Sequence, residues 1–190
     1  MIRMAREEDA ETIASIYGPI VATTAISFEL AVPSVEEMRQ RIRSYLQFAP
    51  WLVFDSGQRV LGYAYASKHR ERKAYQWSVD MAIYVDSTRR QRGIGRALYT
   101  SLAALLRLQG FYAAHAGITL PNAASVALHE SVGFRPVGVY RGVGYKLGAW
   151  HDVGWWQLSL RERAGEPVPP RPIAEAQRDP QWKGALVAGV

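Results

Sequence analysis

Apolar residues near the start of the chain recur every three or four positions, which is the period of an amphipathic helix. Residues 8–22 form the first such stretch, where Pro19 should bend or shorten the helix. The second stretch begins at the capping-box pattern Ser34-x-x-Glu37 and ends before Pro50. The expected buried side of this second helix comprises Val35, Met38, Ile42 and Tyr45.

Beyond residue 50 the pattern changes to short apolar and aromatic runs, which are typical of strands. Residues 51–55 and 60–67 flank Ser56-Gly57 and are expected to form a hairpin. The remaining expected elements are, in order, a strand at 75–85, a helix at 93–109 that stops at Gly110, a strand at 111–118, a helix at 122–132, and strands at 134–139 and 153–160 joined by a glycine-rich bend. With a short strand at residues 2–5, this order predicts an α/β (α+β) fold, in which helices cover both faces of a mixed sheet.

The length of 190 residues and the 48% apolar content indicate one globular domain, which we place at residues 1–163. Residues 164–190 hold five of the ten prolines and are expected to form a mobile or surface-packed tail. The N-terminus is charged from its third residue and no apolar run could span a bilayer, so we expect neither a signal peptide nor a membrane segment. The chain has no cysteine, which excludes disulfides and a cysteine nucleophile and fits a cytoplasmic protein.

The formal net charge of +6 raises the question of nucleic-acid binding. The positive charge is concentrated in residues 68–73 (KHRERK) and in residues 89–96, which contain four arginines. Two small basic clusters suit small anionic ligands better than a long phosphate backbone. The sequence shows no zinc-finger spacing, basic zipper or RNA-binding aromatic signature, so we expect no nucleic-acid partner.

A turn that contains two glycines follows the strand that ends at Val85. It reads RQRGIG, and Gly93 and Gly95 stand where helical spacing begins. The first amides of a helix have no partner within the helix and attract anions, and glycine leaves those amides accessible. Neither the dinucleotide pattern G-x-G-x-x-G nor the loop G-x-x-x-x-G-K-[ST] is present. Residues 89–96 are therefore either an ordinary basic helix start or a phosphate site.

Several stretches of the chain resemble one family. RQRGIG resembles the acetyl-CoA site of the GNAT superfamily of N-acetyltransferases, and PNAASVALHESVGF at residues 121–134 resembles the segment that lines the pantetheine arm in those enzymes. KLGAWHDVGWWQL and the spacing Arg72-x-x-Tyr75 resemble a narrower group, the phosphinothricin and methionine sulfoximine N-acetyltransferases. The resemblance covers residues 2–162. It implies the GNAT fold, acetyl-CoA as the cofactor, and acetyl transfer to the amino group of a small amino-acid-like substrate.

The resemblance also implies binding residues. Those expected to hold acetyl-CoA are Ile83, Tyr84, Val85, Arg90, Gln91, Arg92, Gly93, Ile94, Gly95, Arg96, Asn122 and Ser125. Those expected to contact the acceptor are Phe28, Glu29, Arg70, Arg72 and Tyr75. The alternatives are a solvated charge run for Arg70 and Arg72 and a helix cap for Asn122. No metal site is expected. Family members commonly form dimers, so a homodimer is expected, with Trp155 and Trp156 in its interface or in the core.

Acetyl transfer to an amine requires a base, because an ammonium group has no lone pair. Asp80 is the candidate, since it lies in an otherwise apolar strand where burial should raise its pKa. The resembling enzymes generally have glutamate there, so the shorter aspartate favours a water relay; a structural carboxylate is the alternative. His129 is the candidate acid for the departing thiolate, or else a helix histidine bonded to a carbonyl group. Backbone amides near Ala82 to Val85 are the expected oxyanion donors.

Three functions remain open on the sequence alone. The first is direct acetyl transfer in a ternary complex to a small amino-acid-like amine, since the chain has no cysteine to form an acyl-thiol intermediate. The second is the same chemistry on a protein N-terminus, a polyamine or an antibiotic, although the basic KHRERK segment disfavours a cationic acceptor. The third is a non-enzymatic module that binds coenzyme A or nucleic acid.

Overall fold

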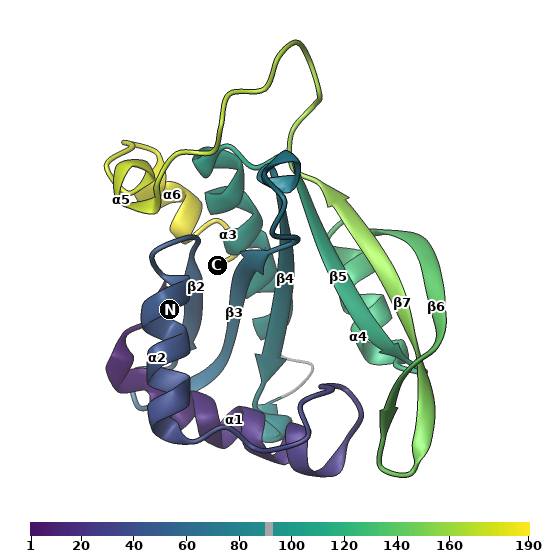
Figure 1. Cartoon of the computed structure of the whole chain (residues 1–190). Coiled ribbons are helices and arrows are strands. Elements are labelled where there is room, and N and C mark those ends of the chain that lie inside the picture. The colour runs from purple at the N-terminus through teal and green to yellow at the C-terminus, as the bar shows by residue number, and fades with distance from the viewer. Residues whose placement is uncertain (90–92) are drawn as a thin grey trace.

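The computed structural model describes residues 1–89 and 93–190, and its centre is a seven-stranded sheet (Figure 1). The strands lie in the order β1-β2-β3-β4-β5-β7-β6, and β4 and β5 are the neighbours that run parallel. Their bounds are β1 Ile2–Met4, β2 Trp51–Asp55, β3 Val60–Lys68, β4 Ser78–Val85, β5 Ala113–Leu120, β6 Arg135–Lys146 and β7 Ala149–Ser159. All other neighbouring strands are antiparallel, so the sheet is mixed, as predicted.

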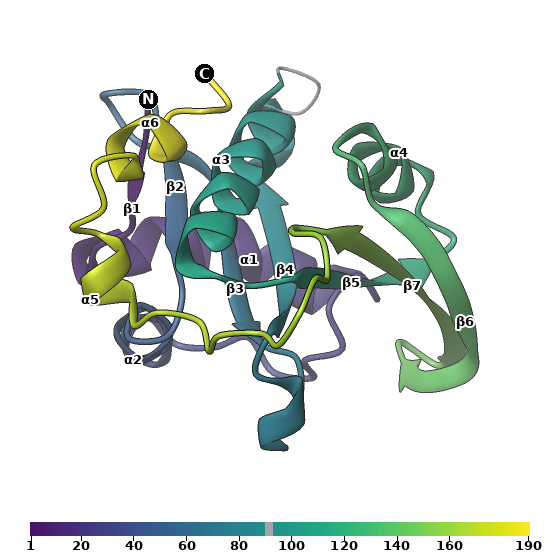
Figure 2. The same ribbon diagram turned by 90° about the horizontal axis from the view of Figure 1, so that it is seen from above.

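Helices cover both faces of the sheet, as Figure 2 shows. One face carries α1 (Ala10–Thr23) and α2 (Val35–Tyr45), and the other carries α3 (Ile94–Gln109) and α4 (Ala123–Ser131). Two short helices, α5 (Ile173–Ala176) and α6 (Trp182–Leu186), pack against α3. Short 3₁₀ helices occur at Glu7–Asp9, Lys73–Tyr75 and Ser87–Arg89. The arrangement confirms the predicted fold class. Within the described parts of the chain, none of the helices has the length and hydropathy needed to cross a bilayer.

The capping and stop signals of the sequence act where they were predicted. Ser34 Oγ accepts a hydrogen bond from the Glu37 amide at 3.2 Å, and the Glu37 carboxylate accepts one from the Ser34 amide at 2.7 Å. Gly110 ends α3 in a left-handed conformation, at a φ of 105°. Of the two effects expected of Pro19, shortening does not occur, because α1 continues through it to Thr23. The expected burial of Val35 is wrong: it is exposed because it is the first residue of α2 and precedes the packed face.

Two cores lie on the two faces of the sheet. The larger core packs under α3, and the strand residues Val79 and Met81 belong to it. The smaller core lies under α1 and α2 and is aromatic, with Trp51 and Tyr63 at its centre and Tyr84 at its edge. Since successive side chains of a strand point to opposite faces, Asp80 and Tyr84 share the face toward α1 and α2.

Residues 164–190 pack along α3 and contribute to the larger core. Ile173 and Trp182 are each 6% exposed and lie within that core. The Trp77 indole nitrogen donates to the Val168 carbonyl oxygen at 2.9 Å, and the Gly189 amide donates to Ser101 Oγ at 3.1 Å. The proline-rich segment is therefore joined to the domain by both apolar and polar contacts.

The glycine-rich bend predicted between the last two strands is wrong: the segment is a long hairpin. Strand β6 continues to Lys146 and turns through Leu147 and Gly148, whose φ angles are 52° and 80°. The pairing of β6 with β7 shifts register between Tyr140 and Gly144, as at a β-bulge. Glycines at a bulge interrupt the pattern of a strand, which explains why the sequence suggested a bend.

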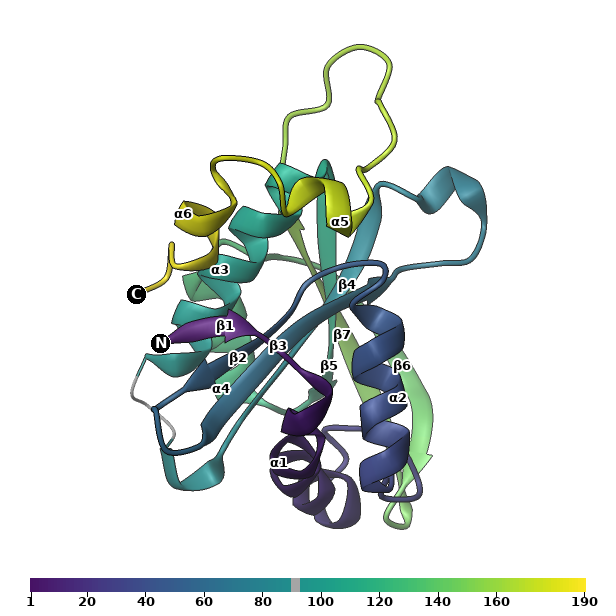
Figure 3. The same ribbon diagram turned by 90° about the vertical axis from the view of Figure 1, so that its left-hand side faces the viewer.

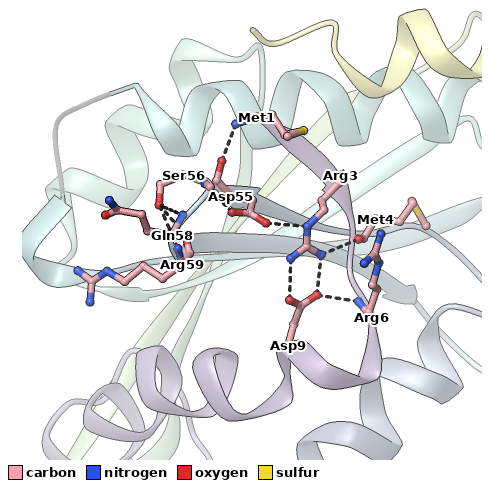
Figure 4. A network of polar contacts seen from close by, with 10 residues as sticks. Met1, Arg3, Met4, Arg6, Asp9, Asp55, Ser56, Gln58 and Arg59 are labelled. Atoms are coloured by element: carbon pink, nitrogen blue, oxygen red, sulfur yellow. Dashed lines mark hydrogen bonds and ion pairs between the residues drawn. The ribbon is translucent and has the colours of Figure 1, made fainter.

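A polar network around Arg3 holds β1 at the edge of the sheet (Figures 3 and 4). The Arg3 guanidinium donates to both carboxylate oxygens of Asp9 and to one of Asp55, each at 2.8 Å. Asp9 precedes α1 and Asp55 ends β2. The network therefore fixes the start of α1 relative to the sheet.

Candidate active site

Strands β4 and β5 form a fork. They pair from Ser78 and Ala113 to Asp80 and His115, and in the described residues the pairing stops there although both strands continue. Figure 1 shows the two strands diverging beyond that point. Within the described parts of the chain, the facing backbone edges have no strand partner past the fork. The segment Ala82 to Val85, where oxyanion donors were predicted, lies on one of these edges.

A cavity of about 470 Å³ beside the fork brings most of the predicted cofactor residues together. The predicted residues that line it are Ile83, Tyr84, Val85, Gly93, Ile94, Gly95, Arg96, Asn122 and Ser125. Arg90, Gln91 and Arg92 were also predicted and lie outside the described residues. The cavity combines the amino end of α3 with apolar walls that include Ile26 and Leu128. Such a site suits a ligand that has both an anionic group and an apolar arm.

The two glycines of the turn have different structural roles. Gly93 precedes α3 at a φ of 76°, which glycine adopts without strain, and a Cβ there would meet no atom within 4 Å. Among the described residues, this glycine leaves the end of the helix open to the cavity. At Gly95 a Cβ would lie 2.9 Å from the Leu128 side chain, so this glycine also lets α4 pack close to α3. The sequence had suggested only the first role for both.

Asn122 and His129 are held by α4. The Asn122 side chain accepts a hydrogen bond from the Ser125 amide at 3.1 Å, so it caps the helix while it also lines the cavity. His129 is 4% exposed, with Nδ1 at 2.7 Å from the Ser125 carbonyl oxygen and Nε2 at 3.0 Å from the Tyr99 hydroxyl. Because a carbonyl oxygen only accepts, Nδ1 carries the proton and Nε2 accepts from Tyr99.

The histidine of α4 is therefore engaged at both nitrogens. Burial lowers the pKa of His129, which favours a neutral ring. Tyr99 and His129 both line a small cavity of about 70 Å³ at the fork, together with Ala82 and Thr119. The Tyr99 hydroxyl is thus a further polar group at this cavity, and its proton points to His129 Nε2. The sequence did not single it out, because it lies on the apolar face of α3.

Asp80 lies at the last pair of the fork, and its side chain is 30% exposed. Burial raises the pKa of Asp80, and the hydrogen bond to His69 works in the opposite direction. Asp80 Oδ1 lies 2.7 Å from His69 Nδ1, and the His69 ring stacks on His115 with 4.2 Å between centroids. Neither histidine was predicted as a site residue. They are distant in the sequence and meet only because β3, β4 and β5 are neighbours.

Two of the predicted acceptor residues lie around this carboxylate. The Arg70 guanidinium lies 5.9 Å from the Trp155 ring centroid, and its positive charge lowers the pKa of Asp80. The Tyr75 ring lies edge-on to His69, at 6.0 Å between centroids. Arg72 is exposed on the same segment, and its side chain has no hydrogen bond or ion pair with any residue that the structure describes.

Phe28 and Glu29 were also predicted to contact the acceptor, and they face different parts of the protein. The Glu29 carboxylate accepts from Arg41 at 2.7 and 2.9 Å and from the Tyr17 hydroxyl at 2.8 Å, and Arg41 lowers the pKa of Glu29. It lines a separate cavity of about 280 Å³ under α1 and α2. Phe28 instead packs on the β6–β7 hairpin, where a Cβ at Gly144 would overlap its ring.

A buried lysine fastens the loop that carries Phe28 and Glu29. Lys146 is 5% exposed, and its ammonium group donates to the carbonyl oxygens of Val21 and Ser27, each at 2.7 Å. The residue belongs to the stretch KLGAW, which served as a family signal but received no role from the sequence. Its position ties the hairpin to the end of α1.

Comparison with family models matches residues 2–155 to the acetyltransferase (GNAT) domain. The chain belongs to the GNAT acetyltransferase family. This confirms the predicted family and enzyme class. The non-enzymatic alternative loses its support.

Two curated proteins and one solved structure show a narrower similarity within GNAT. The chain is 36% identical to phosphinothricin N-acetyltransferase of Streptomyces viridochromogenes, over 90% of this chain and 92% of that protein. It is 32% identical to L-methionine sulfoximine/L-methionine sulfone acetyltransferase of Salmonella typhimurium, over 86% and 96%. A GNAT superfamily phosphinothricin acetyltransferase from Sinorhizobium meliloti, solved in complex with AcCoA, has a TM-score of 0.84 and 34% identity, and the match covers 88% of this chain and 92% of that one. The predicted resemblance to this group is confirmed.

Proposed function

We propose that this GNAT enzyme transfers the acetyl group of acetyl-CoA to the amino group of a small acidic amino-acid-like acceptor, such as phosphinothricin or methionine sulfoximine. The observation that carries the proposal is the fork between β4 and β5. The cavity at the amino end of α3 lies beside the fork, and Asp80 with His69 lies at its closed end. A thioester that extends along the fork would meet an amine held next to that carboxylate. The names of the two curated relatives support the acceptor class.

The described residues fit acetyl-CoA. The open amino end of α3 at Gly93 supplies unpaired amides for the pyrophosphate, and Ile83 and Leu128 supply apolar surface for the pantetheine arm. Acetyl-CoA, when bound, supplies a thioester carbonyl that an amine can attack and a thiolate that can leave. The S. meliloti structure in complex with AcCoA supports the same assignment.

The residues of the fork can serve each requirement of the transfer. Burial raises the pKa of Asp80. This carboxylate is one of the side chains that can accept the proton of the acceptor ammonium. Amides on the unpaired edge of β4 can donate to the carbonyl oxygen as its negative charge develops. The Tyr99 hydroxyl, backed by His129, lies where the thiolate would leave. The absence of cysteine supports direct attack in a ternary complex over an acyl-thiol route.

The charges near Asp80 favour an acidic acceptor. The positive charge of Arg70 lowers the pKa of this carboxylate. Arg72 lies on the same exposed segment and has no ion pair with any described residue. A guanidinium group binds carboxylate or phosphinate through two parallel hydrogen bonds. A polyamine would meet the same positive charges and be repelled, so we place cationic acceptors second.

We also propose that two copies of the chain associate through the outer face of β6. The apolar residues exposed there and on the adjacent turn and strand are Val137, Val139, Tyr140, Val143, Tyr145, Leu147 and Trp150. Strand β6 is an edge strand, and exposed apolar residues on an edge strand favour pairing. Trp155 and Trp156, the sequence candidates for an interface, are instead packed against the sheet. Light scattering of the wild type and of Val139→Lys tests this: a dimer that the substitution dissociates is expected, and a monomeric wild type would refute it.

The acetyl-transfer proposal is tested by mixing the purified protein with acetyl-CoA and an acceptor, then measuring free thiol and the mass of the product. We expect release of thiol with L-phosphinothricin, L-methionine sulfoximine or L-methionine sulfone, and little with spermidine or a basic peptide. Arg72→Ala should raise the acceptor KM more than it lowers kcat, because its contact is made in the ground state as well. Thiol release with none of the amino-acid acceptors would refute the proposal.

A further inference from the structure

The two nitrogens of the His69 ring have different surroundings. Nδ1 lies 2.7 Å from Asp80 Oδ1. An ionised carboxylate only accepts hydrogen bonds, so Nδ1 carries a proton, and in the neutral ring Nε2 carries the lone pair. Nε2 has no hydrogen-bond partner among the described residues, and it is not one of the buried polar atoms that lack one. The ring therefore presents a basic nitrogen to solvent at the closed end of the fork.

We propose that His69 is the catalytic base of this enzyme and that Asp80 is its positioning residue. The inference rests on the proposed acetyl transfer and assigns its proton-transfer step. The N–H bond of the acceptor ammonium breaks, the proton goes to His69 Nε2, and the electron pair stays on the amine nitrogen. That nitrogen then forms the C–N bond to the acetyl carbon and the C–S bond breaks. The sulfur takes the electron pair of the C–S bond, and the second proton of the nitrogen passes to it, which gives the neutral amide and free thiol. His69 afterwards returns the proton to solvent.

The groups around His69 suit this role. Asp80 on β4 stabilises the imidazolium that forms and keeps the ring in the productive tautomer. His115 on β5 stacks on the ring, and burial together with the charges of His69 and Arg70 lowers the pKa of His115, so this neighbour stays neutral. Tyr75 closes the remaining side at 6.0 Å.

A metal ion is the competing occupant of this cluster. One ligand atom each from His69, Asp80 and His115 lie within 4.8 Å of one another. However, two ligand atoms that each stand about 2.0–2.2 Å from a tetrahedral metal lie about 3.4 Å from one another. The 2.7 Å contact between His69 and Asp80 is instead the length of a direct hydrogen bond. The positive charge of Arg70 further disfavours a cation, so the geometry points to a proton relay.

The first test compares His69→Ala with Glu71→Gln, an exposed charge on the same segment, as the control. At neutral pH we expect His69→Ala to lower kcat/KM for L-phosphinothricin by about 10²–10³-fold, the usual contribution of a general base. The deficit should shrink as the pH approaches the pKa of the acceptor amine, and added imidazole should restore part of the rate. Acetyl-CoA binding by calorimetry should match wild type in both variants. A deficit that is constant with pH, or no deficit, would overturn the proposal.

The second test separates His69 from Asp80 and from a metal. Asp80→Asn keeps an oxygen that can accept from Nδ1 and removes the charge, so kcat should fall and added imidazole should give no rescue. Full loss of activity in Asp80→Asn with an active His69→Ala would overturn the proposal in favour of Asp80 alone. Activity lost on dialysis against a chelator and restored by Zn²⁺ would overturn it in favour of a metal. A wild type that acetylates no amine refutes the proposed function as well, whereas an active wild type with an active His69→Ala refutes only the role of His69.

Discussion

Replacing Lys146 by methionine tests whether the hairpin of β6 and β7 holds the loop that carries Phe28 and Glu29 in place. The ammonium group is buried and donates to the carbonyl oxygens of Val21 and Ser27, both at 2.7 Å. Methionine keeps a side chain of similar length and removes the donor, so both carbonyl oxygens lose their partner. The substitution therefore isolates the two hydrogen bonds from the packing of the stem.

The magnitude follows from these two bonds. A hydrogen bond to a charged group contributes about 1.5–3 kcal/mol, and the desolvation of the ammonium offsets part of the gain from two such bonds. We expect Lys146→Met to lower the free energy of unfolding by about 2–4 kcal/mol. For a chain of this size, each kcal/mol lowers Tm by about 2–4 °C. The acceptor KM should also rise, because the freed loop carries Phe28.

Urea unfolding followed by tryptophan fluorescence measures the change, and acetyl-transfer kinetics measures the effect on the loop. Lys183→Met is the matched control, because Lys183 is exposed on α6 and should stay within about 0.5 kcal/mol of wild type, as surface substitutions usually do. If Lys146→Met is as stable as this control and has an unchanged acceptor KM, the lysine does not fasten the loop.

Three further predictions follow from other contacts. Gly144→Ala should displace the Phe28 ring and raise the acceptor KM without changing the acetyl-CoA KM. Gly138→Ala is the control and should change neither KM, because no described atom lies near its added Cβ. Equal kinetics for the two variants would contradict the contact between Gly144 and Phe28. Trp182→Ala should destabilise the fold by about 3–5 kcal/mol in urea unfolding, whereas a loosely attached segment would leave stability unchanged. Arg41 lowers the pKa of Glu29, so the ionised carboxylate stabilises the fold above the pKa that Glu29 has in the unfolded chain. This stability is lost as the pH falls through the lowered pKa of the folded state. Glu29→Gln should therefore lose less Tm in acid than the wild type, and an unchanged dependence of Tm on acid pH would rule out this contribution.

The elements that the sequence predicted well have strong local signals. The helix after Gly93 combines helical spacing with a glycine at each end, and the structure has it at Ile94–Gln109. The capping box at Ser34 involves groups only three residues apart. Most residues predicted to hold acetyl-CoA line one cavity, and they lie in or near two short segments that resemble family motifs. In these cases, information within a few residues determines the structure.

The rest of the site depends on contacts between distant segments. His69 and His115 carry no motif, and only the order of β3, β4 and β5 brings them together. Glu29 looked free to bind an acceptor, but Arg41, one helix later, pairs with it. Lys146 received no role from the sequence, because its glycine-rich segment predicted a bend, whereas the structure has it buried in a long hairpin. The spacing of apolar residues in a sequence predicts which side chains are buried. It does not predict which polar groups from distant segments a buried side chain will contact.

Calorimetric titration with acetyl-CoA tests the central claim most directly, because the proposed function depends on the binding of this molecule at the amino end of α3. Gly93 and Gly57 both have positive φ angles, 76° and 88°, and both have open space around an added Cβ. Valine at either position therefore introduces a similar backbone strain, and only at Gly93 does it enter the cavity. We predict that the wild type and Gly57→Val bind acetyl-CoA alike and that Gly93→Val loses binding. Equal binding by all three proteins, or no binding by the wild type, would contradict the account.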